Sequence, residues 1–352
     1  MKVAILYSDE LKRYDFGSGH PFRGDRFLNF MKLFKEKGLD KNSTFNLIKP
    51  EYASEENLML IHSEEYIQRV KRYESRDIDT PLIPGIDEAA RLIVGASMMA
   101  GEVVMDGKYD SAVGIGGGMH HAGRSREAGF CIFNDVAICA ENLMRKYGLK
   151  RVLILDTDAH AGDGTAEIFY ENPRVLLVDI HQDPRTLYPG VGFIGEIGRG
   201  EGEGFTVNIP LPPWSSDYAY ERVLDELFIP LVEEFKPDII IRNGGSDPHF
   251  KDELTQLGLT LEGFRMIGRK VREVANSVCE GKVVDLICSG YNPTVLPYAW
   301  LALICGVSGV DMELEEPFPF PTWLSRDYGL KEVEKIIQEV KATLRDYWGC
   351  FS

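Results

Sequence analysis

Short apolar runs alternate along the chain with longer amphipathic segments, and the two patterns predict different elements. Seven runs rich in Val, Ile and Leu are nearly continuous rather than alternating, which is typical of parallel strands covered on both faces. These predicted strands are residues 3–7, 111–115, 151–155, 175–180, 206–211, 238–241 and 283–287. The amphipathic segments predict helices at residues 26–36, 54–73, 87–105, 134–147, 218–234, 261–278 and 330–348.

The alternation of strands and helices predicts a three-layer, doubly wound α/β fold with a mainly parallel central sheet. With 352 residues, 44% of them hydrophobic, the chain can bury a large core. The sequence contains no internal repeat, low-complexity tract or stretch typical of an interdomain linker. We therefore expect residues 1–352 to form a single domain.

Polar residues gather where three of the predicted strands end. Run 111–115 leads into GGGMHH, run 151–155 leads into DTDAH, and run 238–241 is followed one residue later by NGGSD. In an open parallel sheet the loops at the carboxyl ends of the strands converge on a crevice where ligands bind. These three loops are therefore expected to contribute to one site.

The second and third of these loops offer ligands for a metal ion. Asp158 and His160 stand two residues apart, so their side chains point the same way if the extended conformation continues. Together with Asp247 they provide one imidazole and two carboxylates, which suits a catalytic divalent ion with open positions for water and substrate. Zn(II) is expected, and Fe(II) or Co(II) fits almost as well. An isolated Asp-x-His more often has a merely structural role, so the hypothesis depends on the surrounding residues.

Those surroundings contain two adjacent histidines and two further carboxylates. His120 and His121 follow three glycines, and Asp156 and Asp163 lie close in sequence to the candidate ligands. Each histidine thus has an acidic partner available. A histidine that donates one ring N–H to a carboxylate is fixed in its tautomer and made more basic, which suits it to accept a proton from an activated water molecule.

Charge and cysteine content exclude several other classes of protein. The formal net charge of -16 disfavours direct binding to nucleic acid, because such a surface repels phosphate backbones. The six cysteines form no CxxC pair, which indicates free thiols in a reducing compartment. No stretch approaches the ~20 apolar residues of a membrane span. A cytoplasmic protein without direct nucleic-acid or membrane binding is expected, and its oligomeric state stays undetermined.

Four ordered blocks of the sequence resemble a known family. They read GMHHAGRSREAGFCIFNDVAI, VLILDTDAHAGDGTAEIFY, IHQDPRTLYPGVG and SGYNPTVLPYAW, and the similarity extends from about Tyr14 to Asp311. In this order the blocks resemble the histone deacetylases, the acetoin-utilisation proteins and the acetylpolyamine amidohydrolases. The resemblance implies a mixed α/β domain and a metal-dependent amidohydrolase that removes acetyl-like groups from amines.

The resemblance also implies a role for each matched residue. It makes the three candidate ligands the metal ligands, and His121 the general base that later protonates the leaving amine. His120 becomes the electrostatic partner, paired with Asp156, while Asp163 pairs with His121. Tyr291 is implied as a hydroxyl donor to the oxygen of the scissile carbonyl, which is an oxyanion-hole role.

The substrate channel is implied in the same way. Gly129 and Phe130 match a glycine-phenylalanine pair that lines a narrow acyl-lysine channel, and Tyr188 falls near the opposite wall. Phe130 and Tyr188 have an alternative interpretation as ordinary core aromatics. Leu254 is expected at the rim, and Asp79 matches an aspartate that holds the backbone of the substrate.

The chain departs from the family pattern at several positions. Many relatives have a second histidine where this chain has Ala161, and glycines where it has Cys288 and Ser289. In many relatives a small hydroxyl residue helps to hold a structural potassium ion where this chain has Asp179, so the resemblance implies a K+ site and this departure counts against it. His249 is interpreted as a satisfied surface histidine rather than a rim residue.

Two other functions stay open. An arginase-like binuclear hydrolase would need a second acidic cluster near Asp247, where this chain has Ser246 and Pro248. A catalytically silent acyl-binding module would be signalled by loss of His121 or Tyr291, and both are present. The expected substrate is acetyl-lysine in proteins or a small acetylated amine such as a polyamine. The motifs do not decide between the two, because the shapes of the loops around the channel mouth are not determined by them.

Overall fold

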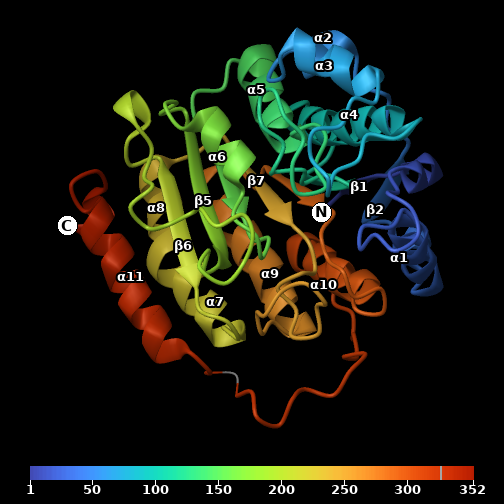
Figure 1. Ribbon diagram of the computed structural model, residues 1–352. Helices are drawn as coiled ribbons and strands as arrows, with labels where there is room; N and C mark the ends of the chain where they lie inside the picture. The colour runs from blue at the N-terminus through green and yellow to red at the C-terminus, as the bar shows by residue number, and fades with distance from the viewer. Residues whose placement is uncertain (326) are drawn as a thin grey trace.

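A single eight-stranded sheet forms the centre of the protein. The computed structural model describes residues 1–325 and 327–352. Its strands follow the order β2-β1-β3-β8-β7-β4-β5-β6, and every neighbouring pair is parallel (Figure 1). Their bounds are β1(Val3–Leu6), β2(Phe45–Ile48), β3(Ser111–Ile115), β4(Val152–Asp156), β5(Val175–Gln182), β6(Thr206–Leu211), β7(Ile239–Gly244) and β8(Val283–Ile287).

Helices cover both faces of this sheet. The first group contains α4, α5 and α6, with α2 against α5, and the second group contains α1, α7, α8, α9, α10 and α11. Both groups contact the central strands, which makes the predicted three-layer α/β arrangement. The helix bounds are α1(Asp25–Glu36), α2(Glu55–Leu58), α3(Glu64–Lys71), α4(Ile86–Met105), α5(Asp135–Tyr147), α6(Asp163–Phe169), α7(Asp217–Val223), α8(Ile229–Phe235), α9(Leu261–Val278), α10(Leu296–Ser308) and α11(Leu330–Leu344).

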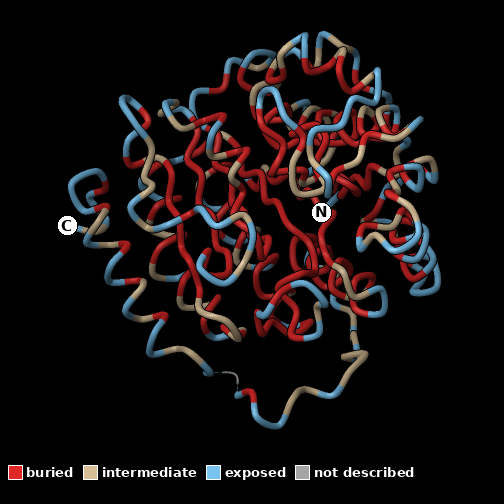
Figure 2. The backbone as a smooth tube through the Cα atoms, viewed as in Figure 1, coloured by how far each residue is buried: buried red, intermediate tan, exposed pale blue. Residues whose placement is uncertain are grey.

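Burial explains why the central strands are nearly continuous apolar runs. All residues of β3, β4, β7 and β8 are buried, since both faces of these strands are covered by helices. Figure 2 shows this core as a buried backbone running through the middle of the molecule. The prediction of a doubly wound, mainly parallel sheet is therefore confirmed.

Several elements differ from the predicted pattern. Strand β2 was not anticipated because it is a short edge strand whose central residues are exposed. The predicted helix 54–73 is two helices, since both Ser54 and Ser63 cap a new helix by accepting a backbone N–H. The predicted helix 218–234 contains the π-helical turn η4(Leu224–Phe228) between α7 and α8. Short 3-10 turns lie at η1(Asp9–Arg13), η2(Leu39–Lys41), η3(Gly200–Gly202) and η5(Gly349–Phe351).

The strand order brings four chemically rich loops together. Strands β3, β8, β7 and β4 are neighbours in the middle of the sheet although they are far apart in the sequence. Since they are parallel, their carboxyl ends lie at one edge, and the loops that follow them carry the histidine pair, Tyr291, Asp247 and the Asp158-His160 pair.

Two further observations bear on the sequence expectations. Among the described residues, none of the helices combines the length and apolar character that crossing a membrane requires. All six cysteines are free thiols, and Cys350 is the exposed one.

Candidate metal centre and active site

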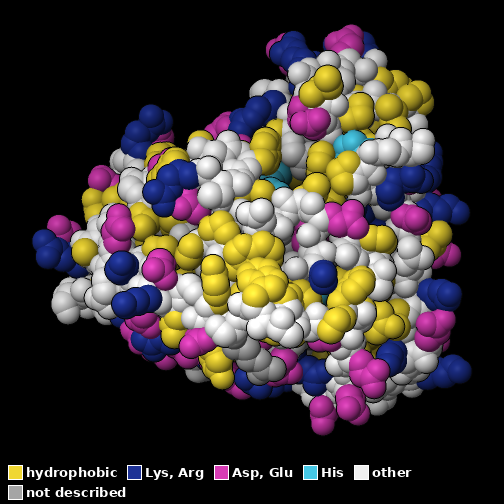
Figure 3. Space-filling view, turned by 60° about the horizontal axis from the view of Figure 1, so that its bottom comes forward, with side chains coloured by type: hydrophobic (Ala, Val, Ile, Leu, Met, Phe, Trp, Pro, Cys, Tyr) yellow, Lys and Arg dark blue, Asp and Glu magenta, His cyan; other side chains and the backbone are white. Residues whose placement is uncertain are grey.

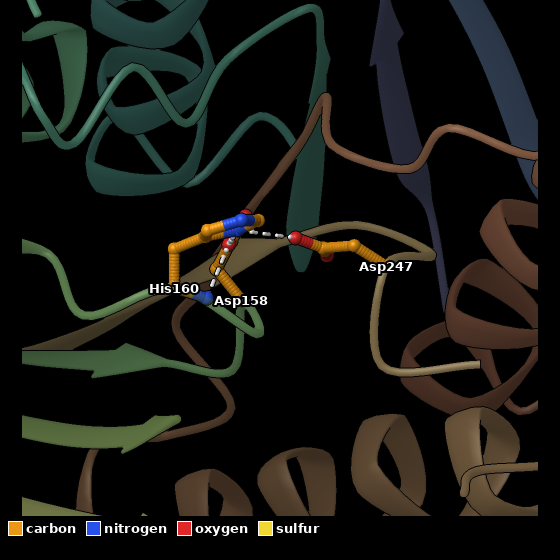
Figure 4. Close-up of side chains that lie close together, drawn as sticks. All are labelled: Asp158, His160 and Asp247. Atoms are coloured by element: carbon orange, nitrogen blue, oxygen red, sulfur yellow. Dashed lines mark hydrogen bonds and ion pairs between the residues drawn. The ribbon is translucent and has the colours of Figure 1, made fainter. Parts of the chain in front are cut away.

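Three predicted ligands converge beyond the ends of β4 and β7. The Nδ1 atom of His160 lies 3.0 Å from Oδ1 of Asp158 and 3.1 Å from Oδ2 of Asp247 (Figure 4). One candidate ligand atom from each residue lies within 4.8 Å of the others, and all three residues are buried. In the described part of the chain this is the one such group, so the structure contains a possible mononuclear metal site.

The charges at this point fit a cation. Burial, together with the charge of Asp158, raises the pKa of Asp247 well above its usual range. Although burial opposes a charged imidazole, Asp158 and Asp247 raise the pKa of His160 to about 10. The two buried carboxylates therefore favour a positive charge between them, and the donor set of one imidazole and two carboxylates suits a divalent metal.

The two carboxylate ligands are held in place by neighbouring groups. Asp247 accepts a hydrogen bond at Oδ1 from the Ser289 hydroxyl, 2.6 Å away, and its backbone carbonyl accepts one from the Thr255 hydroxyl. Asp158 accepts the backbone N–H of His160 at 2.8 Å. Such supporting contacts orient ligands around a metal.

The adjacent histidines each pair with the predicted carboxylate. Nδ1 of His120 lies 2.7 Å from Oδ2 of Asp156, and Nδ1 of His121 lies 2.7 Å from Oδ1 of Asp163. The two imidazole rings are 4.1 Å apart between their centroids. Both rings are therefore oriented through Nδ1, which leaves Nε2 of each for other partners.

The two histidines differ in protonation because their surroundings differ. Burial opposes the charged form of His120, but the carboxylates of Asp156 and Asp158 outweigh it and raise its pKa to about 10. Burial and the neighbouring His120 lower the pKa of His121 to about 4. At neutral pH His121 is thus the neutral imidazole, the form that can accept a proton.

Tyr291 follows β8 and is partly buried. Burial, reinforced by the charges of Asp247 and Asp158, raises the pKa of Tyr291 well above its ordinary value, so its hydroxyl keeps its proton. The backbone N–H of Tyr291 donates to Oδ2 of Asp252 at 2.7 Å. The preceding Gly290 has φ +120°, and a Cβ there would collide with the side chain of Ser246.

A cavity of about 270 Å³ connects these groups with the surface. Its walls contain His121, His160 and Tyr291 together with all five predicted substrate-binding residues. Asp77 and Leu187, which were not predicted, also line it. The complete lining is Asp77, Asp79, His121, Gly129, Phe130, His160, Leu187, Tyr188, Leu254 and Tyr291. The structure therefore brings the predicted catalytic, ligand and substrate-binding residues to one place.

The channel wall is fixed on one side by Gly129 and Phe130. A Cβ on Gly129 would lie 2.3 Å from Cδ2 of His121, so only glycine allows this approach. The backbone of Phe130 is held by Tyr14, whose hydroxyl donates to its carbonyl at 2.7 Å, and by Thr80, whose hydroxyl accepts its N–H at 2.9 Å. The aromatic ring of Phe130 packs edge-on against Tyr291.

The rim of the channel is less tightly held. Tyr188 packs edge-on against His121, with centroids 5.1 Å apart, yet remains half exposed, as does Leu254. Asp79 is exposed, and its backbone carbonyl contacts Nε2 of His20 at 3.1 Å. On the face shown in Figure 3, hydrophobic side chains gather around the middle, with charged side chains mostly towards the margin.

Sequence reasoning missed several supporting residues. Asn243 donates from Nδ2 to Oδ2 of Asp156 at 2.6 Å, and Arg26 is buried with its guanidinium over the Phe22 ring. Ser289 had been noted only as a departure from the family pattern, although it bonds to Asp247. Asn243 could have been found as a polar residue just after the predicted strand 238–241, whereas no local signal marks Arg26.

Two of the noted departures have clear structural surroundings. Asp179 lies beside Asp156 in the register of β4 and β5; it accepts the N–H of Gly162 at 2.8 Å and contacts Nδ1 of His181 at 2.7 Å. His249 is fully buried, so its interpretation as a surface histidine is wrong, although its ring nitrogens are satisfied.

A doubly wound parallel sheet that brings an Asp-His-Asp cluster and two His-Asp pairs to the bottom of a channel is an α/β fold with a candidate metal site suited to hydrolysis. A model of the histone deacetylase domain matches residues 20–307, and the chain therefore belongs to the histone deacetylase family. The prediction of a hydrolytic enzyme of the deacetylase class is confirmed by this membership.

Individual relatives support the same assignment. The chain is 37% identical over 361 aligned residues to a probable deacetylase of Archaeoglobus fulgidus, with 100% of both chains covered. It is 36% identical over 334 residues to the acetoin utilization protein AcuC of Bacillus subtilis, with 91% of this chain and 85% of that protein covered. The solved HDA15 HD domain superimposes with a TM-score of 0.86 at 23% identity, over 99% of this chain and 97% of that domain, which shows the shared fold.

Proposed function

We propose that this protein is a mononuclear, zinc-type deacetylase that hydrolyses the amide of an N-acetylated amine, either acetyl-lysine in proteins or a small acetylated amine. The observation that carries the proposal is the common position of His121, His160 and Tyr291 on the wall of one channel. A base, a candidate metal ligand and a hydroxyl donor thereby face the same reacting group.

The metal would be held by Asp158, His160 and Asp247. Zn(II) is proposed, with Fe(II) or Co(II) as alternatives, because one nitrogen and two oxygen ligands suit each of them. When bound, such an ion supplies Lewis acidity, which polarises the substrate carbonyl and lowers the pKa of water.

His121 is proposed to move the proton. Asp163 accepts its Nδ1–H, so the neutral ring offers Nε2 to the channel and can take a proton from the attacking water. The same ring then returns the proton to the nitrogen of the leaving amine. His120, paired with Asp156 and charged at neutral pH, would stabilise negative charge that develops beside it.

Tyr291 is proposed to stabilise the tetrahedral oxyanion. Its protonated hydroxyl can donate a hydrogen bond to the carbonyl oxygen as that oxygen gains charge. Gly129, Phe130 and Tyr188 would enclose the linear methylene chain of the substrate, with Leu254 and Asp79 at its outer end. We further propose that residues 1–352 act as one catalytic domain, since α11 packs against β6 of the central sheet.

A structural potassium ion is the weaker part of the proposal. Asp156 and Asp179 are adjacent buried carboxylates, which favours a cation near them. However, Asp179 uses both of its oxygens for Gly162 and His181, so a K+ site requires these contacts to be shared.

Acetate release tests the proposed function. Protein stripped of metal is assayed with a fluorogenic acetyl-lysine substrate before and after addition of one equivalent of Zn(II), Fe(II), Co(II) or Mn(II). Activity restored at one metal per chain supports a mononuclear deacetylase. Stoichiometric binding without turnover of acetyl-lysine or acetylated polyamines would favour a silent acyl-binding module, and a requirement for two Mn(II) per chain would favour a binuclear hydrolase.

A further inference from the structure

The segment that joins α10 to α11 lies outside the family-matched region and contacts His249, a residue close in sequence to the candidate ligand Asp247. The match to the histone deacetylase domain ends at residue 307, and residues 309–325 then run along the bottom of the molecule in the view of Figure 1. Within this segment, the Glu316 carboxylate reaches two other elements. Its Oε2 lies 3.1 Å from Nε2 of His249, and its Oε1 accepts the backbone N–H of Leu261 at 2.5 Å.

His249 is the contact that leads towards the metal site. It follows Asp247 by two residues, and its side chain is fully buried. Its Nδ1 accepts the backbone N–H of Lys251 at 3.0 Å, so the ring proton must reside on Nε2 and be donated to Glu316. The ring stacks on Phe250, with centroids 4.3 Å apart, and lies parallel to Phe264. The imidazole is therefore fixed both by packing and by hydrogen bonds.

The loop of residues 247–254, here called the ligand loop, connects this histidine with two parts of the site. It begins at Asp247 and includes Asp252, which accepts the backbone N–H of Tyr291 at 2.7 Å. The backbone N–H of Asp252 in turn donates to the carbonyl of His249 at 2.9 Å. A shift of His249 would thus be transmitted to a metal ligand and to the proposed oxyanion donor.

The second hydrogen bond explains why a carboxylate is stable at this position. Leu261 is the first residue of α9, an 18-residue helix whose first N–H groups have no partner within the helix and carry partial positive charge. Glu316 places a negative charge at that end while it accepts the hydrogen bond from Nε2–H of His249. One side chain thereby ties the ligand loop to the start of a long helix.

We propose that Glu316 is a positioning residue that acts through His249 to hold the ligand loop in the geometry required for metal binding and turnover. This inference rests on the proposed deacetylase function. It assigns a role in the reaction to a segment beyond the part of the chain that the family match covers.

The test compares Glu316→Ala and Glu316→Gln with Glu315→Ala, which removes an exposed carboxylate from the same segment. Zn(II) affinity is measured by competition with a chelator, alongside kcat, KM and thermal stability. Loss of a group that orients metal ligands typically costs about 10–100-fold in metal affinity or activity. We expect Glu316→Ala to lose about that much in kcat or Zn(II) affinity with little change in KM. The kcat and Zn(II) affinity of Glu316→Gln should lie between those of the unaltered protein and those of Glu316→Ala, since its one amide oxygen can replace only one of the two accepted hydrogen bonds.

A double variant separates positioning from simple stabilisation of α9. In the His249→Phe background, Glu316→Ala should cause almost no further loss of kcat or Zn(II) affinity, because the two side chains act in series. An equal loss in both backgrounds, or a fall in thermal stability with unchanged kcat and Zn(II) affinity, would overturn the proposal. The metal-affinity comparison needs no substrate, so it decides the inference even if the proposed deacetylase reaction fails its own test.

Discussion

The bottom of the channel and its rim are built in different ways. At the bottom, Asp158, His160 and Asp247 are 2%, 8% and 0% exposed and project from loops next to buried central strands. At the rim, Tyr188 and Leu254 are 49% and 41% exposed and lie on irregular segments. The proposed reacting groups are therefore fixed by the sheet, whereas the residues proposed to contact the rest of the substrate lie on surface loops.

This difference separates what family membership determines from what it leaves open. The proposed chemistry depends on side chains whose positions follow from strand order and register. Under the same proposal, choice among acetylated amines depends on rim side chains with few supporting contacts. Substitutions at the bottom should therefore affect metal binding or kcat, while substitutions at the rim should mainly affect KM.

The largest effect is expected from Asp158→Asn. The change removes a charged candidate ligand, so both metal and turnover should be lost, with activity falling by more than the about 10⁴-fold that a general base can contribute. Metal content measured by atomic spectroscopy and acetate release check this together. Full metal occupancy in the variant would show that Asp158 is not a ligand.

The next largest effect is expected from His121→Ala. Removing the proposed base should lower kcat by roughly 10²–10⁴ while the metal remains bound, because the three ligands are intact. The measurement is steady-state kinetics on protein whose metal content has been verified. Turnover equal to that of the unaltered protein would exclude His121 as the base.

Tyr291→Phe should have a smaller effect because only one hydrogen-bond donor is lost. We expect kcat to fall by roughly 10²–10³, with metal affinity unchanged. Tyr218→Phe, at an exposed tyrosine that does not line the channel, is the matched control. Equal kcat values for the two variants would argue against an oxyanion role.

The buried His62 is expected to make the free energy of unfolding depend on pH. His62 accepts the backbone N–H of Asn134 at Nε2, and burial lowers its pKa from 6.5 to about 4. Because the unfolded chain binds this proton more readily, stability is present above pH 6.5 and falls as the pH drops towards 4, by about 3 kcal/mol. His62→Gln keeps an acceptor without titrating, so denaturant unfolding should show a weaker loss over this pH range. An unchanged pH slope would contradict the assignment.

The parts of the site that the sequence predicts are those tied to buried strands. Asp158, His160 and Asp247 could be identified because each follows a continuous apolar run, and parallel strands bring such positions to one edge. The paired carboxylates Asp156 and Asp163 were also predicted, since they lie close in sequence to the ligands. Local pattern therefore predicted the candidate ligands and their acidic neighbours, whereas the roles of His121 and Tyr291 were implied by the family resemblance.

Other features depend on contacts that local patterns do not contain. Helix α10 is buried on all sides, so it has no amphipathic period to reveal it. The bond from Ser289 to Asp247 joins residues 42 positions apart, and the contact between Glu316 and His249 joins residues 67 apart. Their roles follow from the strand order and from the path of the chain after α10.

The smallest effect is expected at the rim, from Leu254→Ala. Its side chain is partly exposed already, so shortening it should remove only about 1 kcal/mol of apolar contact with a bound substrate. That corresponds to an about fivefold rise in KM, with kcat unchanged. Leu28→Ala is a suitable control, since Leu28 is 37% exposed but does not line the channel. If the change at Leu254 lowered kcat as strongly as Tyr291→Phe, the rim would be part of the reacting geometry, and the division between bottom and rim would be wrong. A KM effect that differs between an acetyl-lysine peptide and a small acetylated amine would instead identify Leu254 as a determinant of substrate choice.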